Sequence, residues 1–183
     1  MNRIVEMGTN IGAGLTALAI ENPGAELVGV EPDPANVEVA RLNLSRFGSR
    51  VRVIQAAIWH EETDLVVAPK DAAGEHGLTV RPRTSDDPPG FLQMRGITID
   101  TLLDEAFPGE TVDYMHVTIE GSEQRVFEAG GAWPERVSSL RVELHPYFGY
   151  LAEECIAQLE RLGYRAYRAP DPPDKWIFAV RDH

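Results

Sequence analysis

The sequence predicts an α/β protein with a mostly parallel sheet, helices on both faces of that sheet and a C-terminal antiparallel hairpin. Short apolar runs alternate along the chain with segments whose apolar residues recur at helical spacing, the pattern of repeated strand–helix units. The last two apolar runs, 164–168 and 176–180, are joined by a Pro-rich turn that is too short for a crossover helix, so they must pair antiparallel. Right-handed crossovers bring the strand ends to one edge of such a sheet, where we expect the functional site.

Strands and helices are expected to alternate from the first residues onward. In chain order, the strands are expected at residues 4–7, 27–30, from 51 onward, 97–99, 112–119, 140–144, 164–168 and 176–180. The helices are expected from residue 14 to about 22, and at 34–47, 100–107, 122–129 and 151–162.

Capping residues support several of these helix boundaries. Asp33 is a suitable N-cap, and Pro34 suits the first helical position because the N–H that proline lacks would have no partner there. Gly48 is expected to end that helix, and Asp100 to cap the next one. Residues 68–96 are rich in proline, glycine and charge, which indicates a loop or hairpin excursion.

Composition excludes several classes of protein. The chain has 183 residues, with 17 Lys and Arg against 29 Asp and Glu, so its formal net charge is −12. An acidic protein lacks the basic surface that neutralises nucleic-acid phosphates, which argues against non-specific binding of DNA or RNA. No apolar run approaches the ~20 residues that span a bilayer, which excludes a membrane span. The single cysteine, Cys155, rules out an internal disulfide and a Cys-based zinc site. We therefore expect one cytoplasmic domain that binds neither nucleic acid nor membrane.

A glycine loop follows the first strand, and an acid follows the second. Gly8, Gly12 and Gly14 have the spacing G-x-x-x-G-x-G, which differs from the G-x-G-x-x-G of dinucleotide-binding loops. Glu31, at the end of the second strand, is placed to accept hydrogen bonds from both hydroxyls of a ribose. The pattern therefore indicates a nucleoside-type cofactor. The alternative is that the glycines only form a tight turn and that Glu31 is solvated.

Six segments follow one another in order between about residues 4 and 146. They are Glu6-Met7-Gly8-Thr9-Asn10-Ile11-Gly12, Glu31-Pro32-Asp33-Pro34 with Asn36 and Asn43, Gln55-Ala56-Ala57-Ile58, Thr98-Ile99-Asp100-Thr101-Leu102, Val117-Thr118-Ile119-Glu120-Gly121-Ser122-Glu123 and Val142-Glu143-Leu144-His145. Together they resemble the motifs of the FkbM family of S-adenosylmethionine-dependent methyltransferases. The resemblance implies one Rossmann-like methyltransferase domain over residues 1–183, with 68–96 as an excursion. It also implies O-methylation of a hydroxyl on a small molecule or glycan.

The same resemblance implies S-adenosyl-L-methionine as cofactor and assigns residues to its parts. The expected cofactor-binding residues are Glu6, Gly8, Asn10, Gly12, Glu31, Gln55 and Ala56. The backbone around residues 8–12 should face the methionine part, Glu31 the ribose, and Gln55 with Ala56 the adenine edge.

Three departures from the family pattern bear on activity. Glu6 stands where the family usually has Asp, and Thr118 replaces the Asp of the Lys-Ile-Asp signature, so a carboxylate is missing near the expected methyl-transfer centre. The sequence given also begins at the first strand, without the N-terminal extension that usually helps to cover the cofactor. We expect either that the true start lies upstream of Met1 or that the site is open.

The resemblance and the strand-end position place Glu120, Glu143 and His145 on the acceptor side. Methylation of an alcohol needs alignment and a base that takes the hydroxyl proton, and histidine has the most suitable intrinsic pKa. His145 is therefore the first candidate for the base. Alternatively, Glu120 starts a helix and His145 ends a strand without a catalytic role. These three side chains also have the chemistry to hold a divalent metal, but no ligand spacing supports one, and we expect none.

Two other functions remain open at this point. Thr118 and the missing N-terminal cover favour a catalytically impaired module that only binds the cofactor. An NAD-dependent oxidoreductase would need a different glycine spacing.

Overall fold

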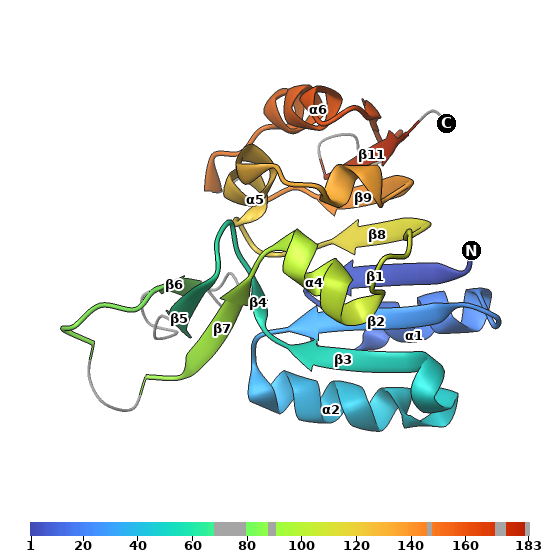
Figure 1. Cartoon of the computed structure of the whole chain (residues 1–183), viewed down its shortest axis with the longest axis vertical. Helices are drawn as coiled ribbons and strands as arrows, with labels where there is room; N and C mark the ends of the chain where they lie inside the picture. Colours follow the sequence, from blue (N-terminus) through green and yellow to red (C-terminus); the bar gives the residue numbers. More distant parts are fainter. Residues whose placement is uncertain (68–79, 88–90, 146–147, 171–174, 182–183) are drawn as a thin grey trace.

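A seven-stranded sheet forms the centre of the computed structural model, which describes residues 1–67, 80–87, 91–145, 148–170 and 175–181. The strand order is β10-β11-β9-β8-β1-β2-β3 (Figure 1). These strands span Arg3–Met7 (β1), Glu26–Glu31 (β2), Val51–Gln55 (β3), Tyr114–Val117 (β8), Ser139–Glu143 (β9), Arg165–Arg168 (β10) and Trp176–Val180 (β11).

The pairing of the strands confirms the predicted sheet. β1 pairs in parallel with β2 and β8, β2 with β3, and β8 with β9. β11 pairs antiparallel with both β9 and β10, so the last two strands form the expected hairpin. The carboxyl ends of β1, β2, β3, β8 and β9 therefore meet at one edge of the sheet.

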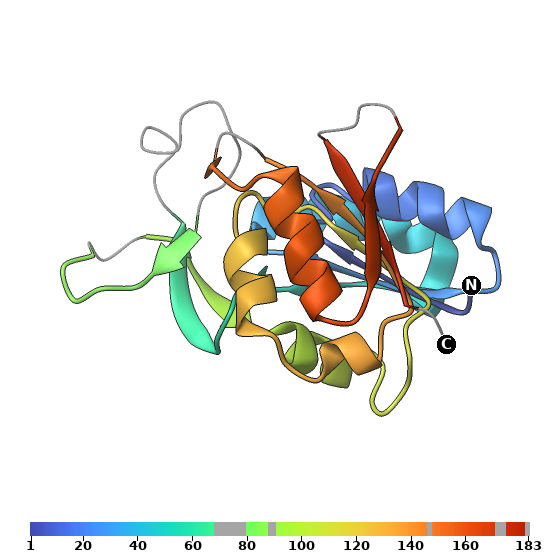
Figure 2. The same ribbon diagram turned by 90° about the horizontal axis from the view of Figure 1, so that it is seen from above.

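Helices cover both faces of this sheet (Figure 2). The helices are α1 (Ala13–Glu21), α2 (Pro34–Leu44), α4 (Ile99–Ala106), α5 (Glu123–Ala129) and α6 (Ala152–Arg161). Alternate strand residues separate the two layers: Ile4 and Leu27 pack with α1 and α2, whereas Val5 and Val28 pack with α4, α5 and α6. Within the described part of the chain, no helix combines the length and the apolar character that a membrane span requires.

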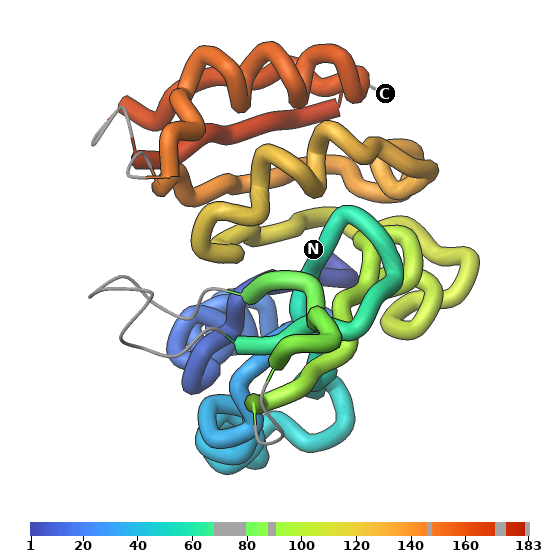
Figure 3. Tube along the Cα trace, turned by 90° about the vertical axis from the view of Figure 1, so that its left-hand side faces the viewer, coloured from blue at the N-terminus to red at the C-terminus, as the bar shows by residue number. Residues whose placement is uncertain are grey.

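A second, four-stranded sheet lies beyond the carboxyl ends of the central strands (Figures 1 and 3). Its order is β4-β7-β5-β6, from Ala57–Ile58 (β4), Gln93–Ile97 (β7), Thr63–Val67 (β5) and Val80–Pro82 (β6). The antiparallel pairs of β5 with β6 and β7 show that the expected excursion at 68–96 includes sheet structure, although residues 68–79 and 88–90 lie outside the described part.

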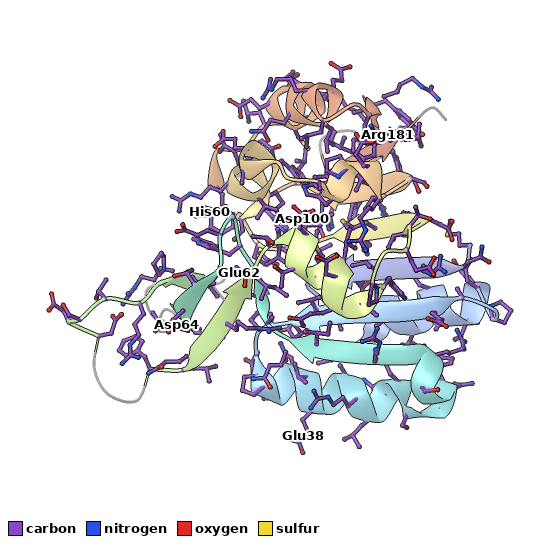
Figure 4. The ribbon with its side chains drawn as sticks, viewed as in Figure 1. Glu38, His60, Glu62, Asp64, Asp100 and Arg181 are labelled. Atoms are coloured by element: carbon purple, nitrogen blue, oxygen red, sulfur yellow. The ribbon has the colours of Figure 1, made fainter. Side chains whose placement is uncertain are left out.

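The predicted strand at 97–99 is wrong, because the chain has already turned into α4 at Ile99. β7 ends at Ile97, which pairs with Ile58 of β4. Thr98 has extended backbone angles and its hydroxyl accepts a hydrogen bond from Thr101 N at 3.1 Å, so Thr98 is the N-cap, not Asp100. The Asp100 carboxylate instead accepts from Ala132 N at 3.0 Å, near the middle of the molecule in Figure 4.

The start of α2 is as predicted, but its end is not. Asp33 accepts a hydrogen bond from Ala35 N at 2.8 Å, and Pro34 is the first helical residue. The α-helix ends at Leu44, and a 3₁₀ segment, Ser45–Arg50, continues from it. Gly48 lies inside that 3₁₀ segment with φ +62°. It therefore turns the chain toward β3 instead of ending the α-helix as expected.

We predict that Leu102→Ala lowers the free energy of unfolding by ~2–5 kcal/mol, because Leu102 on α4 is fully buried in the larger core. Leu42→Ala on α2 is the matched control, since Leu42 is 70% exposed and its loss should change the free energy by less than about 0.5 kcal/mol. Urea titration of both variants measures the difference. Equal losses would contradict the assignment of the α4 face to the core.

Candidate functional site

A cavity of about 590 Å³ opens at the edge where the carboxyl ends of the parallel strands meet. We call it the edge cavity. It is lined by Gly8, Asn10, Val30, Glu31, Pro32, Asp33, Asn36, Ala56, Ala57, Ile58, Val80, Thr118, Ile119, Glu120, Ser122 and Glu143. Most of these residues lie at or just after the ends of β1, β2, β3, β8 and β9, and Val80 belongs to β6 of the second sheet. The cavity therefore lies at the predicted edge. Its volume is within the range of small-molecule sites.

The loop after β1 is shaped by a close approach of two strand ends. Gly8 has φ +85°, and a Cβ atom there would lie 1.9 Å from the carbonyl oxygen of Thr118. Only glycine fits that position. The backbone N–H groups of Gly8 and Thr9 both donate to Val30 O at 2.9 Å, which fixes the loop against the end of β2. Asn10 follows with φ +50°, in the left-handed region that asparagine tolerates.

The Glu31 carboxylate ties this loop to the start of α2. One carboxylate oxygen, Oε2, accepts from Asn10 N at 2.8 Å. The other, Oε1, accepts from Asp33 N at 3.0 Å and from Asn36 Nδ2 at 3.3 Å. An ionised carboxylate offers about four acceptor positions, so three donors leave capacity for a hydroxyl from a ligand. Glu31 is only 5% exposed, yet it lines the edge cavity.

The predicted cofactor residues fall into two groups. Gly8, Asn10, Glu31 and Ala56 line the edge cavity. The other three, Glu6, Gly12 and Gln55, are not among the described residues that line it.

Two members of the second group have packing contacts that account for their residue types. The Glu6 carboxylate is buried under the loop, where it accepts from Thr9 Oγ1 at 2.7 Å and lies 3.2 Å from His116 Nδ1. Gly12 begins α1 with φ +83°, and a Cβ there would lie 3.3 Å from Ala40 on α2. Gly12 therefore allows α1 and α2 to approach each other closely.

The three acceptor-side candidates follow β8 or lie at the end of β9. In the strand order, β1 separates these two strands from β2, which carries Glu31. Glu120 and Glu143 both line the cavity. The Glu143 carboxylate forms an ion pair with Lys175 Nζ at 3.0 Å. His145 is 8% exposed and is not among the described lining residues.

Thr118 occupies the signature position where the family has Asp, and its hydroxyl is committed to the backbone. Thr118 Oγ1 lies 3.0 Å from Met7 O and 3.1 Å from Gly8 O, to which it donates. The side chain thus supports the loop after β1, and its carbonyl is the group that requires glycine at position 8.

A buried carboxylate that the sequence reasoning did not single out, Glu123, organises the loop between β8 and α5. Its Oε1 accepts from Ile119 N at 3.2 Å and its Oε2 from Gly121 N at 2.8 Å. The same Oε1 lies 3.1 Å from His145 Nδ1, which joins the loop to the end of β9. On its other side, His145 Nε2 lies 3.6 Å from Glu120 Oε2. A chain of three ionisable groups, Glu123–His145–Glu120, therefore leads from the interior to the cavity wall.

The sequence does contain a signal for Glu123: it is the last acid of the Glu-Gly-x-Glu segment, three residues after Glu120. An acid just after a glycine turn at the start of a helix is a common acceptor for backbone N–H groups. Glu120 with φ +50° and Gly121 with φ +91° form the turn that this acceptor stabilises.

The residues that form the edge cavity fall within a match to a known protein family. The model of the methyltransferase FkbM domain matches residues 6–166, which covers most of the chain and includes both walls of the edge cavity. The chain belongs to the FkbM methyltransferase domain family. The predicted family is confirmed, and family membership implies S-adenosylmethionine as the cofactor.

Two curated proteins are similar to this FkbM domain in sequence. The ribosomal RNA small subunit methyltransferase H of Geobacter sulfurreducens is 28% identical over 145 residues, which are 74% of this chain and 46% of that protein. The ribosomal protein L11 methyltransferase of Thermus thermophilus is 31% identical over 126 residues, 66% of this chain and 49% of that protein. The chain thus spans about half the length of these relatives.

Solved methyltransferases share the fold. The METTL16 methyltransferase domain superposes with a TM-score of 0.59 at 12% identity, covering 100% of this chain and 60% of that one. The O-methyltransferase of Bacillus cereus in complex with SAH gives 0.55 at 15% identity, covering 99% of this chain and 74% of that one. These likenesses confirm the Rossmann-like methyltransferase fold and, at such identities, nothing beyond the fold.

The edge cavity of the FkbM domain fits the cofactor that the family implies. A ribose needs a carboxylate that accepts from its hydroxyls, and the Glu31 carboxylate has acceptor capacity beyond its three donors. Adenine needs an apolar wall, and the cavity lining includes the apolar residues Ala56, Ala57 and Ile58. Among the described residues, no group of three or more His, Cys, Asp or Glu side chains is arranged to hold a metal ion.

The FkbM domain holds His145 in a strongly anionic environment. Burial alone would lower the pKa of His145, but the hydrogen bond to Glu123 and the negative charges of Glu123, Glu120 and Glu143 outweigh burial and raise that pKa above 6.5. Both ring nitrogens face carboxylate oxygens, an arrangement that favours the doubly protonated ring. Such an imidazolium has no lone pair with which to accept a proton from an alcohol.

We predict that NMR titration of the histidine rings places the pKa of His145 above 6.5, its ordinary value, with His145→Gln used to assign the signal. Glu123→Gln should lower that pKa, because it removes the nearest charge while burial still penalises the imidazolium. The raised pKa also stabilises the fold: this contribution is full below about pH 6.5 and is lost as the pH rises through the raised value. A His145 that titrates at or below 6.5 in the unmodified protein would contradict this arrangement.

Proposed function

We propose that the chain is an S-adenosylmethionine-dependent O-methyltransferase that acts on a hydroxyl of a small molecule or glycan. The observation that carries the proposal is the composition of the edge cavity. Glu31 and the glycine loop form one side, and the carboxylates of Glu120 and Glu143 belong to the other. Such a cavity has an acceptor for a nucleoside at one end and groups that bind a hydroxyl at the other.

The cofactor side of the proposal uses the residues that line the cavity. Glu31 accepts from the ribose hydroxyls, the backbone after Gly8 faces the methionine part, and Ala56 packs on the adenine. Glu6 and Gly12 act on the cofactor indirectly, because their contacts shape the loop between β1 and α1. Gln55, the last residue of β3, lies beside Ala56 and is assigned with it to the adenine edge. The bound cofactor supplies a methyl group on a positively charged sulfur, which an in-line nucleophile attacks.

On the acceptor side, we assign the base to Glu120, which lines the cavity, and orientation to His145, which stands behind it. This assignment departs from the sequence-based preference for His145, and the two carboxylates at its ring nitrogens support the change. A carboxylate oxygen of Glu120 would take the proton of the acceptor hydroxyl. The ring of His145, with Nε2 3.6 Å from Glu120 Oε2, attracts that carboxylate by its charge and limits its rotation. Glu143, paired with Lys175, binds a second hydroxyl of the acceptor.

The charge of the chain favours a small molecule or glycan over RNA as the acceptor. One relative is named as a ribosomal RNA methyltransferase and another as a ribosomal protein methyltransferase, so both macromolecules belong among the acceptors to be tested. Binding of RNA gains most of its affinity from cations that neutralise phosphates. A net charge of −12 works against that contribution.

One observation favours a second candidate, a module that binds the cofactor without transferring its methyl group. Thr118 replaces a carboxylate of the family signature, and its hydroxyl is used to support the loop after β1. In the proposed enzyme, Glu120 supplies the carboxylate that Thr118 lacks. Binding of the cofactor without methylation of any hydroxylated acceptor would favour the module instead.

Glu31→Ala should weaken binding of S-adenosylhomocysteine by ~1–3 kcal/mol, because hydrogen bonds from the ribose to a charged acceptor are lost. Isothermal titration calorimetry measures the effect. Glu38→Ala is the matched control: it removes the same charge from an exposed position on the outer side of α2 (Figure 4) and should leave the affinity unchanged. An unchanged affinity in Glu31→Ala, with the fold intact, would show that the ribose binds elsewhere.

Radiolabelled methyl transfer from S-adenosylmethionine to a panel of sugars, glycosides and polyols, with RNA and peptides as separate arms, tests the reaction itself. Glu120→Gln should lower turnover of the best acceptor ~10²–10⁴-fold, since a general base contributes about that much. Its affinity for S-adenosylhomocysteine should stay within about twofold, because the assigned cofactor residues are untouched. Full activity of Glu120→Gln would exclude it as the base.

A further inference from the structure

We propose that a second cavity beside the edge cavity binds the methyl acceptor, and that it selects a hydroxylated ring compound carrying a carboxylate or a phosphate. This inference rests on the proposed function, since it names the class of acceptor for the same site. We call this second cavity the Trp59 cavity; its volume is about 390 Å³. It is lined by Trp59, Val80, Arg81, Pro82, Ile119, Glu120, Gly121, Ser122, Gln124, Arg125 and Phe148.

The two cavities share part of their walls. Val80, Ile119, Glu120 and Ser122 line both of them. Glu120, the assigned base, therefore stands where the two spaces meet. A molecule in the Trp59 cavity could present a hydroxyl to Glu120 while the cofactor occupies the edge cavity.

Two aromatic side chains of the Trp59 cavity suit a ring-shaped ligand. Trp59 follows β4 and is 4% exposed, so its ring is held firmly in place. Phe148 is packed against the loop after β8: a Cβ atom on Gly121 would lie 2.4 Å from its ring. Aromatic rings offer flat apolar surfaces, and a few polar groups around them fix the orientation of a ligand.

The Trp59 indole adds an unmet hydrogen-bond donor to the same wall. Its Nε1 is buried and has no acceptor among the residues that the structure describes. A buried donor without a partner costs about 1–3 kcal/mol. A ligand oxygen brought into this wall would reduce that cost.

Arginine gives the Trp59 cavity a positive side in a negatively charged protein. The guanidinium carbon of Arg125 lies 5.8 Å from the centre of the Trp59 ring. In the described part of the chain, Arg125 has neither an ion pair nor a hydrogen bond from its guanidinium to another residue, and its side chain is exposed. Its five N–H donors match the planar geometry of a carboxylate or phosphate.

The other charges around the cavity leave Arg125 as the anion-binding group. Arg81 is already paired with Asp87 through two hydrogen bonds. Glu120 faces the imidazole of His145. The overall charge of −12 acts from farther away, and salt screens exposed charges beyond about 8–10 Å. The local guanidinium therefore determines which charge the acceptor bears.

Three sugars that differ only at carbon 6 test this inference: glucose, glucuronate and glucose 6-phosphate. Each is titrated by calorimetry into the protein saturated with S-adenosylhomocysteine. At least one of the two anionic sugars should bind about tenfold more tightly than glucose, a difference of about 1.4 kcal/mol. Whichever of them binds more tightly identifies the carboxylate or the phosphate as the preferred group.

Arg125→Gln should reduce that preference to less than fivefold. Arg46→Gln is the matched control, because Arg46 is also exposed and also stacks on an aromatic ring, with its guanidinium carbon 5.3 Å from the centre of Phe47, outside the residues that line either cavity. It should keep the full preference.

Two results would overturn the inference: a preference below fivefold in the unmodified protein, or an equal preference in Arg125→Gln. Failure of the proposed function looks different, since a folded protein that does not bind S-adenosylhomocysteine would contradict the cofactor site before any sugar is added. Binding of S-adenosylhomocysteine without selection for an anionic sugar would contradict only the acceptor class.

Discussion

The hydrogen bonds of the Glu31 carboxylate hold together the part of the molecule on which the proposed chemistry depends. Glu31 joins the loop after β1, through Asn10 N, to the start of α2, through Asp33 N. The backbone of that loop also donates to Val30, next to Glu31, so the ends of β1 and β2 form one unit. A carboxylate that shapes its own surroundings in this way is pre-organised for a ligand, because little further ordering is required when a ribose binds.

The sequence predicted the order of strands and helices well, because apolar periodicity and the short C-terminal turn are local signals. It placed the N-cap of α4 at Asp100 instead of Thr98, since either residue type is a suitable N-cap and only the pairing of β7 with β4 decides where the strand ends. Of the second sheet, only β6 and most of β7 fall within the expected excursion at 68–96, and β4 and β5 were not predicted. Its strands pair with one another across residues far apart in sequence, a relation that periodicity does not reveal.

For the site, the sequence indicated which residue types are present, but not which of their side chains line the cavity and which are buried behind it. Glu31, Glu120 and Glu143 line the edge cavity as a strand-end position suggests, whereas His145 is buried between two carboxylates. Its intrinsic pKa pointed to a base, and its surroundings favour a cation that orients Glu120. Glu123 and Arg125 went unnoticed because their significance comes from contacts with loops that fold against α5.

Net charge describes the whole chain and does not determine the charge of a single site. The net charge of −12 argues against a nucleic-acid acceptor, while the wall of the Trp59 cavity carries a guanidinium suited to a small anion. A crystal structure of the protein with S-adenosylhomocysteine is the sharpest test of the proposed cofactor site. We expect the ribose hydroxyls within hydrogen-bond distance of the Glu31 carboxylate and the sulfur on the side of Glu120. A ligand bound outside the edge cavity, or a ribose held by other residues, would contradict the proposed site.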